Sequence, residues 1–309
     1  MKHLFIINPI AGGSDKSVVL KERIDRIFEK RDDEYEIYVT SAPMDAPLKI
    51  ISSAANGGGL RVYACGGDGT LNECVNGVAG LPGTAVTHYP CGTGNDFIKT
   101  FGAEKNKFTD LNGLINGRAR PTDLINCNGR YCINICSVGL DARIGTDVHK
   151  YSKIPLIGGP GGYIISTVAN VIKGTTVPLR ISCGEEITDG AVTLVCACNG
   201  RYYGGFFNPM PTALIDDGIT EFLTVGKVSR IGFIKMVGKY AKGRFRELGG
   251  IVKHLRGTRM EISSETELAI NADGELLRGK EISFETVPGG VDFIFPEDFR
   301  YFDIPSGKN

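Results

Sequence analysis

The chain has 309 residues, in which 35 lysines and arginines balance 35 aspartates and glutamates. This balance argues against a nucleic-acid partner held by bulk charge, and the length favours two domains over one. Apolar runs such as Leu4–Ile7 fall far short of the roughly 18 residues of a membrane span, so we expect neither an integral nor an exported protein. The nine cysteines lie in apolar settings and predict reduced, buried thiols in the cytoplasm; zinc bound by Cys127, Cys132 and Cys136 is the weaker alternative.

Residues 1–120 alternate between two hydrophobic patterns. Strands are predicted at "HLFIIN", "EYEIYVT", "LRVYAC" and "TAVTHYP". Helices are predicted over residues 15–31, around 46–55 and from about Thr70. This βαβα order predicts a parallel sheet covered on both faces, in a Rossmann-like α/β nucleotide-binding domain.

Beyond Pro121 the pattern changes to short strands separated by turn residues. The segments "RYCINICSV", "AVTLVCACN", "TELAIN", "KEISFETV" and "VDFIF" predict a mostly antiparallel β-sandwich, with a hairpin at Pro288 to Gly290. Two helices interrupt it, one over "YIISTVANVIK" after the loop "IGGPGG" and one over residues 230–246.

Three glycine-rich turns follow strands of the first domain: "NPIAGG", "GGDGT" and "PCGTGND". Such turns let backbone N–H groups converge on an anion, and in a parallel sheet they would meet at its carboxyl edge. Asp68 would repel phosphates unless a divalent cation lay between, so the motif predicts Mg-ATP. The alternatives are turns that merely connect elements and an aspartate that fixes a tight turn. Neither a P-loop nor a complete G-x-G-x-x-G motif is present.

These motifs, followed by "NADGE" at residues 271–275, resemble the diacylglycerol kinase catalytic-domain family of bacterial lipid kinases over nearly the whole chain. The resemblance implies an ATP and magnesium domain of residues 1–121 and 296–309, and a β-sandwich of residues 122–295 for the lipid. It assigns nucleotide contacts to Asn8, Pro9, Gly12, Thr40, Gly66, Gly67, Asp68, Gly69, Thr70, Leu71, Asn72 and Thr93.

The resemblance also implies catalytic and structural roles elsewhere. Asp68, Asp273 and Glu275 are the expected catalytic carboxylates, and either of the last two could be the base; an ordinary β-turn is the alternative for "NADGE". The loop "ALIDDGI" implies a structural magnesium bound by Asp217 and the backbone carbonyls of Leu214 and Ile219. Asp96 and Asp123 are expected in an interdomain network.

The implied reaction is transfer of the γ-phosphoryl group of Mg-ATP to a hydroxyl of a membrane lipid such as diacylglycerol. A NAD kinase, which shares "GGDGT", and a non-catalytic nucleotide or lipid sensor are the alternatives. One departure bears on them: where soluble diacylglycerol kinases often carry a lysine directly after "NPxxG", this chain has Gly13, and Lys16 is the nearest lysine.

A basic stretch lies between residues 227 and 259. Its bases are Lys227, Arg230, Lys235, Lys239, Lys242, Arg244, Arg246, Lys253, Arg256 and Arg259, against the single acid Glu247. It predicts a cytoplasmic protein docked peripherally to the anionic inner face of a membrane. The alternative is a solvated surface balanced by acids elsewhere in the fold, and a homodimer is left open.

Overall fold

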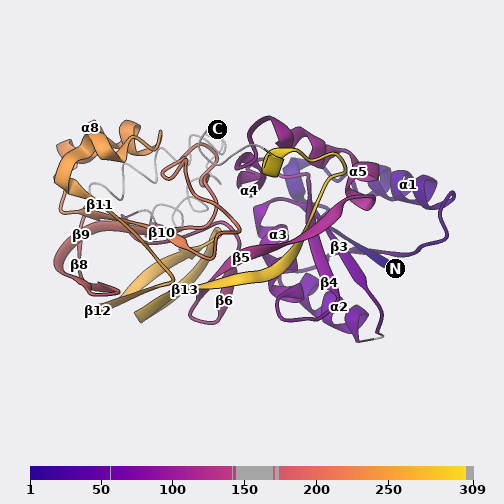
Figure 1. The fold of residues 1–309 in the computed structure, drawn as a ribbon, viewed down its shortest axis with the longest axis horizontal. Helices are drawn as coiled ribbons and strands as arrows, with labels where there is room; N and C mark the ends of the chain where they lie inside the picture. The colour runs from indigo at the N-terminus through magenta and orange to yellow at the C-terminus, as the bar shows by residue number, and fades with distance from the viewer. Residues whose placement is uncertain (56, 141, 144–169, 171–173, 304–309) are drawn as a thin grey trace. The chain divides into compact units, whose positions relative to one another are not determined.

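The computed structural model describes residues 1–55, 57–140, 142–143, 170 and 174–303. The chain divides into two compact units (Figure 1): unit 1 comprises Met1–Leu124 with Pro288–Asn309, and unit 2 comprises Ile125–Val287. The predicted helix "YIISTVANVIK" and the glycine loop before it lie outside the described residues. Within the described residues, none of the helices is long and apolar enough to cross a membrane.

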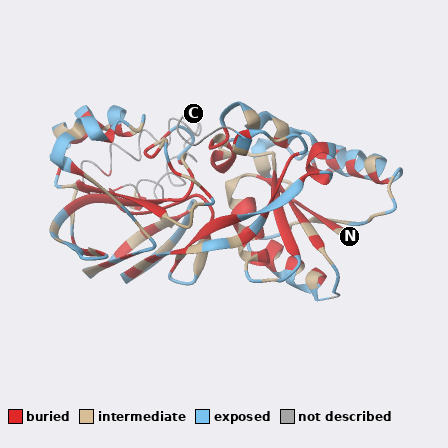
Figure 2. Cartoon of the chain, in the orientation of Figure 1, coloured by how far each residue is buried: buried red, intermediate tan, exposed pale blue. Residues whose placement is uncertain are grey.

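Unit 1 is an α/β unit built on a parallel sheet, as the alternating pattern predicts. The strand order is β2 (Glu34–Val39), β1 (Lys2–Ile7), β3 (Leu60–Gly66), β4 (Thr84–Pro90) and the last residues of β13 (Glu275–Phe295). Its helices are α1 (Ser17–Phe28), α2 (Asp45–Ala54), α3 (Asp68–Val78), α4 (Asp96–Lys99) and α5 (Leu111–Ile115). All residues of β1 after Lys2 are buried, as in a strand covered on both faces (Figure 2).

Helices α2 and α3 pack closely against one another. A Cβ atom on Gly77 of α3 would lie 3.0 Å from Cα of Pro47 and 2.9 Å from Cδ1 of Ile50, both in α2. The absence of a side chain at Gly77 therefore lets the two helices approach closely. Their contact holds α3 in place and thereby positions the turn from which α3 begins.

Unit 2 is an antiparallel β-rich unit. Its strands are β6 (Arg130–Cys132), β7 (Ile135–Gly139), β8 (Val177–Cys183), β9 (Glu186–Cys198), β10 (Thr220–Gly226), β11 (Val252–Gly257) and β12 (Arg259–Ala272), with parts of β5 (Arg118–Cys127) and β13. The long strands β9 and β12 each pair with β7 near one end and with β8 near the other. The pairing of β12 with β13 shifts register between Ser263 and Leu268, which allows β12 to bend. Helix α8 (Arg230–Tyr240) packs on this unit and is followed by the 3-10 segment Phe245–Ile251.

Two of the strand predictions are wrong in detail. No hairpin forms at Pro288 to Gly290, because β13 continues through them and changes partner from β12 to the parallel strand β4, so that "VDFIF" belongs to unit 1. The segment "RYCINICSV" is two strands, because the backbone N–H groups of Ile133 and Asn134 bond to Asp273 instead of continuing a ladder.

The cysteines are free thiols, and all except Cys91 are buried. Cys127, Cys132 and Cys136 belong to the apolar core of unit 2, where burial raises the pKa of Cys132 to about 11. Zinc binds thiolates, whereas burial raises the pKa of both Cys132 and Cys136 and so favours their protonated thiols. The described residues contain no group of three or more His, Cys, Asp or Glu side chains placed to hold a metal ion, so the zinc alternative has no support.

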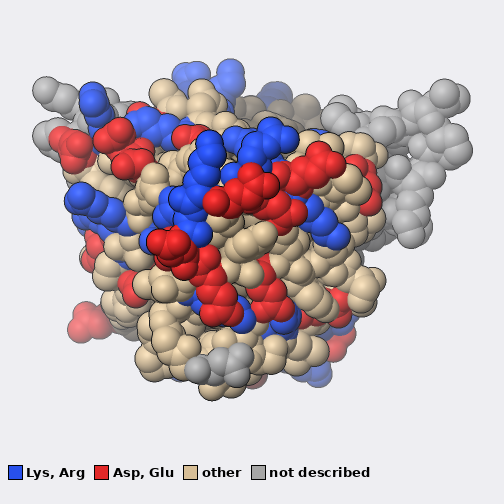
Figure 3. Space-filling model, turned by 90° about the vertical axis from the view of Figure 1, so that its right-hand side faces the viewer, with Lys and Arg blue, Asp and Glu red and all other residues tan. Residues whose placement is uncertain are grey.

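Surface charge is balanced locally on the face shown in Figure 3, where acidic and basic side chains are intermingled. Among the ion pairs of unit 1, Glu36 lies within ion-pair distance of both Lys2 and Lys49. Such partly exposed pairs contribute little stability, about 0–1 kcal/mol each.

His88 of β4 is fully buried, with Nε2 lying 3.1 Å from the carbonyl oxygen of Gly66. That oxygen also accepts hydrogen bonds from the backbone N–H groups of Cys91 and Gly92. Burial lowers the pKa of His88 to about 4, with the bond to Gly66 opposing the shift, so the ring is neutral at physiological pH.

The low pKa of His88 makes the fold acid-sensitive. In the unfolded chain His88 has a pKa near 6.5, whereas in the folded protein it binds a proton only near pH 4. The free energy of unfolding should therefore fall as pH drops through this window, by about 2 kcal/mol at pH 5 from this residue alone. Urea unfolding at pH 7.5 and pH 5 should show a smaller loss for His88→Gln than for the wild type; equal losses would contradict the assignment.

Candidate active site

The three glycine-rich turns of unit 1 come together at the carboxyl ends of β1, β3 and β4. A Cβ atom on Gly92 would lie 2.5 Å from Cα of Gly67, and one on Gly12 would lie 2.4 Å from the carbonyl oxygen of Cys91. Gly12 also has a positive φ of 74°. The turns thus contact one another through backbone atoms, at distances that only glycine allows.

Polar side chains link the β1 turn to the start of α3. The Asn8 side-chain amide donates to Oγ1 of Thr70 at 3.1 Å, and the Thr70 hydroxyl occupies the space that a Cβ atom on Gly66 would need, at 2.2 Å. Thr40 follows β2, and its backbone N–H donates to the carbonyl oxygen of Ile7 at 2.9 Å.

The remaining predicted nucleotide residues divide by exposure. Leu71 and Asn72 are 1 % and 0 % exposed, so these side chains pack in the interior and support the turn rather than face a ligand. Thr93 is exposed in the turn after β4, and Pro9 and Gly69 are partly exposed.

Asp68 is the first residue of α3 and connects two of the turns. Its Oδ1 accepts the backbone N–H of Asp96 at 2.5 Å, and a Cβ atom on Gly94 would lie 2.6 Å from its Oδ2. Asp96 in turn pairs with Lys99 at 2.6 Å. The Asp68 carboxylate is therefore positioned by the backbone of the β4 turn, and it remains partly exposed.

A lysine lies beside the β1 turn despite Gly13. The Nζ atom of Lys16 would be 3.7 Å from a Cβ atom on Gly12, and its charge opposes the rise that burial gives to the pKa of the Cys91 thiol. Lys16 thus brings a positive charge to the place where three backbones meet.

In unit 2, Asp273 and Gly274 form the two-residue turn between β12 and β13, with φ values of 52° and 95°. The prediction of a β-turn at "NADGE" is therefore confirmed. The Asp273 side chain also binds a distant segment of the chain. Its oxygens accept backbone N–H bonds from Ile133 at 2.7 Å, Asn134 at 3.1 Å and Ile135 at 2.9 Å. Glu275, the first residue of β13, is exposed.

Asn134 is a polar residue that the sequence reasoning missed. It is 7 % exposed, its amide nitrogen donates to the carbonyl of Tyr202, and its Oδ1 is buried without a hydrogen-bond partner in the described part of the chain. The available signal was one asparagine inside the apolar segment "YCINICSV". This acceptor faces Gly200, on which a Cβ atom would lie only 1.9 Å from it.

Asp123, in β5, is buried at 3 % exposure, and its Oδ1 accepts the backbone N–H of Gly289 at 2.8 Å. Gly289 has a φ of 58°, so the bond holds an irregular position of β13. The contacts described for Asp96 and Asp123 lie within unit 1.

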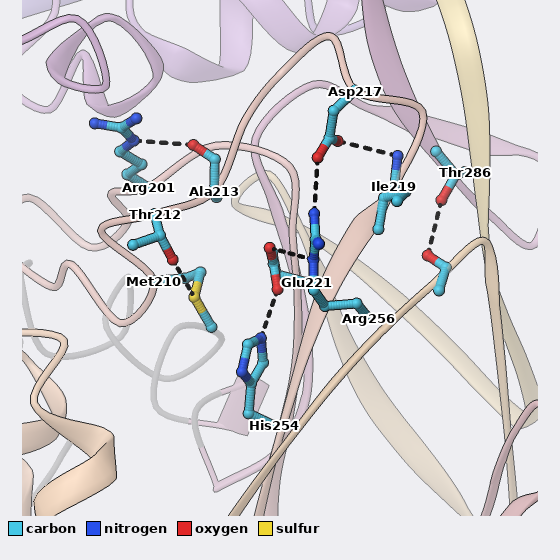
Figure 4. Close-up of polar contacts among 11 residues, drawn as sticks. Arg201, Met210, Thr212, Ala213, Asp217, Ile219, Glu221, His254, Arg256 and Thr286 are labelled. Carbon is cyan, nitrogen blue, oxygen red and sulfur yellow. Dashed lines mark hydrogen bonds and ion pairs between the residues drawn. The ribbon is translucent and has the colours of Figure 1, made fainter. Parts of the chain in front are cut away.

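Arg256 is the charge partner of Asp217 in the loop expected to hold magnesium (Figure 4). Oδ2 of Asp217 accepts from the Arg256 guanidinium at 3.0 Å, and Oδ1 accepts the backbone N–H of Ile219 at 3.1 Å. The same guanidinium donates to Glu221 at 3.0 Å, and Glu221 bonds to His254 at 2.5 Å. The Asp217 carboxylate thus already has a cationic partner in Arg256, and the magnesium site implied at this loop stays a prediction.

Unit 1 is thus an α/β unit with a glycine-lined, carboxylate-bearing edge, and unit 2 is an antiparallel β-rich unit. The chain matches the diacylglycerol kinase catalytic domain family over residues 2–127 and the YegS C-terminal NAD kinase beta sandwich-like domain over residues 134–295. The chain therefore belongs to the family of diacylglycerol kinase-like lipid kinases.

Curated relatives and solved structures agree with this family. The chain is 28% identical over 253 residues to "Probable lipid kinase YegS-like" of Shewanella frigidimarina, covering 81% of each chain. It is 26% identical over 241 residues to "Putative lipid kinase" of Staphylococcus aureus strain Mu3, covering 77% of each. A crystal structure titled as a "putative diacylglycerol kinase" from Bacillus anthracis superposes with a TM-score of 0.76 at 26% identity, covering 96% of this chain and 98% of that one.

Thermal unfolding with and without a chelator tells whether Arg256 or a magnesium ion is the cation that balances Asp217. With Arg256 as the partner, the midpoint of the wild type should be the same in EDTA and in excess magnesium. Arg256→Met should lower it by roughly 2–4 °C, the equivalent of about 1 kcal/mol, because the buried Glu221 and the Asp217 carboxylate lose their cation.

The matched control is Arg259→Met, which removes an exposed pair with Glu261 and should change the midpoint less. A wild-type midpoint that falls in EDTA would show that a divalent cation holds the loop after all.

Proposed function

We propose that the protein is an ATP-dependent lipid kinase that transfers the γ-phosphoryl group of Mg-ATP to a hydroxyl of a membrane lipid, diacylglycerol or a related molecule. One observation carries the proposal: the backbone contact of three glycine turns with Asp68 at the carboxyl edge of a parallel sheet. Family membership supports the reaction class.

The glycine turns suit the phosphates of a nucleotide. Because Gly12, Gly67 and Gly92 carry no Cβ atom, the three turns gather their backbones at one place beside the N-terminus of α3, whose positive end favours phosphate oxygens. Asp68 would hold magnesium, which when bound neutralises charge on the phosphates. Lys16 would supply further positive charge at the β1 turn.

The acceptor side of the reaction needs a group that takes the hydroxyl proton. The lipid oxygen forms a bond to phosphorus, the bond from phosphorus to the bridging oxygen of ADP breaks, and the proton passes to a carboxylate. We assign that carboxylate to Glu275, which is exposed, because both oxygens of Asp273 already accept backbone N–H bonds. Asp273 is then a positioning residue that holds residues 133–135 against the turn that precedes Glu275.

The second candidate function is a NAD kinase, favoured by the match of residues 134–295 to a domain described as NAD kinase beta sandwich-like. Labelled ATP offered to lipid vesicles and to NAD in parallel separates the two. We expect label in the lipid fraction; label in NADP alone would overturn the proposal. Nucleotide binding without transfer to either acceptor would indicate a sensor.

Substitutions of Asp68 and Glu275 should have different effects on Mg-ATP binding and on phosphoryl transfer. Asp68→Asn should raise the KM for Mg-ATP and lower kcat, because the metal loses its ligand. Glu275→Gln should lower kcat by roughly 10²–10⁴-fold with little change in that KM, as expected for a general base. Steady-state kinetics with the accepted lipid measures both.

The matched control is Glu281→Gln, an exposed carboxylate of the same strand, which should behave as wild type. Asp273→Asn should lower the thermal midpoint together with kcat, since three N–H bonds lose a charged acceptor. A full loss of turnover in Asp273→Asn at unchanged midpoint, with Glu275→Gln active, would make Asp273 the base.

A further inference from the structure

Helix α8 has an apolar group on both of its faces. Phe233, Met236 and Tyr240 are buried against the core of unit 2. Ile231 and Ile234, three positions apart and hence neighbours on the helix surface, are 68% and 69% exposed. The inner face explains why the helix packs; the outer face has no such explanation.

The exposed isoleucines lie between basic side chains. At 100° per residue, Ile231, Ile234 and the exposed Gly238 point outward together, opposite the buried residues, while Arg230 and Lys235 lie at the two edges of this face. We call this face, formed by Arg230, Ile231, Ile234, Lys235 and Gly238, the outer face of α8. An apolar centre with cationic edges is the pattern of a helix that lies in a membrane interface.

Within the described part of the chain, the bases of this stretch that lack an acidic partner lie around helix α8. Arg244 and Lys239 pair with Glu247, Lys253 with Glu186, Arg256 with Asp217 and Glu221, and Arg259 with Glu261 and Glu285. Half of the ten bases are thus paired with acidic side chains, as expected for a solvated surface balanced by acids elsewhere in the fold. Among the described residues, Lys227, Lys235, Lys242 and Arg246 have no acidic partner within ion-pair distance, and all four lie on α8 or within six residues of its ends.

We propose that the outer face of α8 docks the protein on an anionic lipid bilayer, with Ile231 and Ile234 inserted at the level of the acyl chains and the bases against lipid phosphates. Charge complementarity selects this occupant, because the apolar centre is bordered by cations and an anionic surface attracts each of them. The inference rests on the proposed function for its purpose, since an enzyme acting on a membrane lipid must reach the bilayer.

Vesicle co-sedimentation of the full chain tests the docking directly. Binding to phosphatidylcholine vesicles containing phosphatidylglycerol should exceed binding to phosphatidylcholine alone and should weaken as salt rises. Ile231→Ser with Ile234→Ser should weaken partitioning roughly tenfold or more, since each loses several buried CH₂ groups. Lys227→Gln with Lys235→Gln should weaken it roughly fivefold per charge, on anionic vesicles only.

Ile187→Ser is the matched control, because Ile187 is 59% exposed on β9 and outside the basic stretch; it should bind as wild type. Equal binding by the Ile231/Ile234 variant and the wild type would overturn the proposal. So would a wild-type dimer that this variant converts to a monomer with vesicle binding unchanged, because the face would then bind a second copy.

An assay of phosphate transfer to a short-chain lipid dispersed as monomers measures the reaction without any need for membrane docking. The Ile231/Ile234 variant should retain transfer to this acceptor while losing activity on vesicles. If the wild type transfers phosphate to no lipid yet binds vesicles through α8, the docking stands and the proposed reaction fails. Transfer to vesicles at the wild-type rate by the variant would overturn the docking alone.

Discussion

The structure of unit 1 depends on the close approach of the turns after β3 and β4. The Gly66 carbonyl accepts hydrogen bonds from the N–H groups of Cys91 and Gly92, with His88 beneath it, and the backbones of Gly67 and Gly92 touch. This contact sets where α3 begins and so places Asp68 next to the β4 turn. A side chain at Gly92 would separate the turns, and the predicted phosphate site requires that they meet.

The two units share one device, a carboxylate fixed by backbone N–H groups of a distant segment. Asp68 accepts the N–H of Asp96, and Asp273 accepts three such bonds from residues 133–135. Each bond anchors a loop to a strand or helix end, where rigid elements limit its movement. Charged acceptors strengthen these bonds, so the polar groups proposed to carry function also hold the local fold.

Periodicity in the sequence predicted the parallel sheet, its helices and the antiparallel second unit, because burial on one face or two leaves a regular pattern. It failed where a side chain overrode the ladder, as at Ile133 and Asn134, and at Pro288, where a strand changes partner instead of turning. Glycine spacing identified the turns of the candidate site. The pairing of Arg256 with Asp217 could not be predicted, since it joins positions 39 residues apart across neighbouring loops and strands.

The affinity of Mg-ATP for Gly92→Ala, measured by calorimetry against wild type, tests the central claim most directly. Gly250→Ala is the control, because a Cβ atom at Gly250 meets nothing within 4 Å. We predict that Gly92→Ala keeps its secondary structure by circular dichroism but loses nucleotide binding, while Gly250→Ala binds as wild type. A folded Gly92→Ala protein with an unchanged Kd would contradict the account, because the touching turns would then not form the phosphate site.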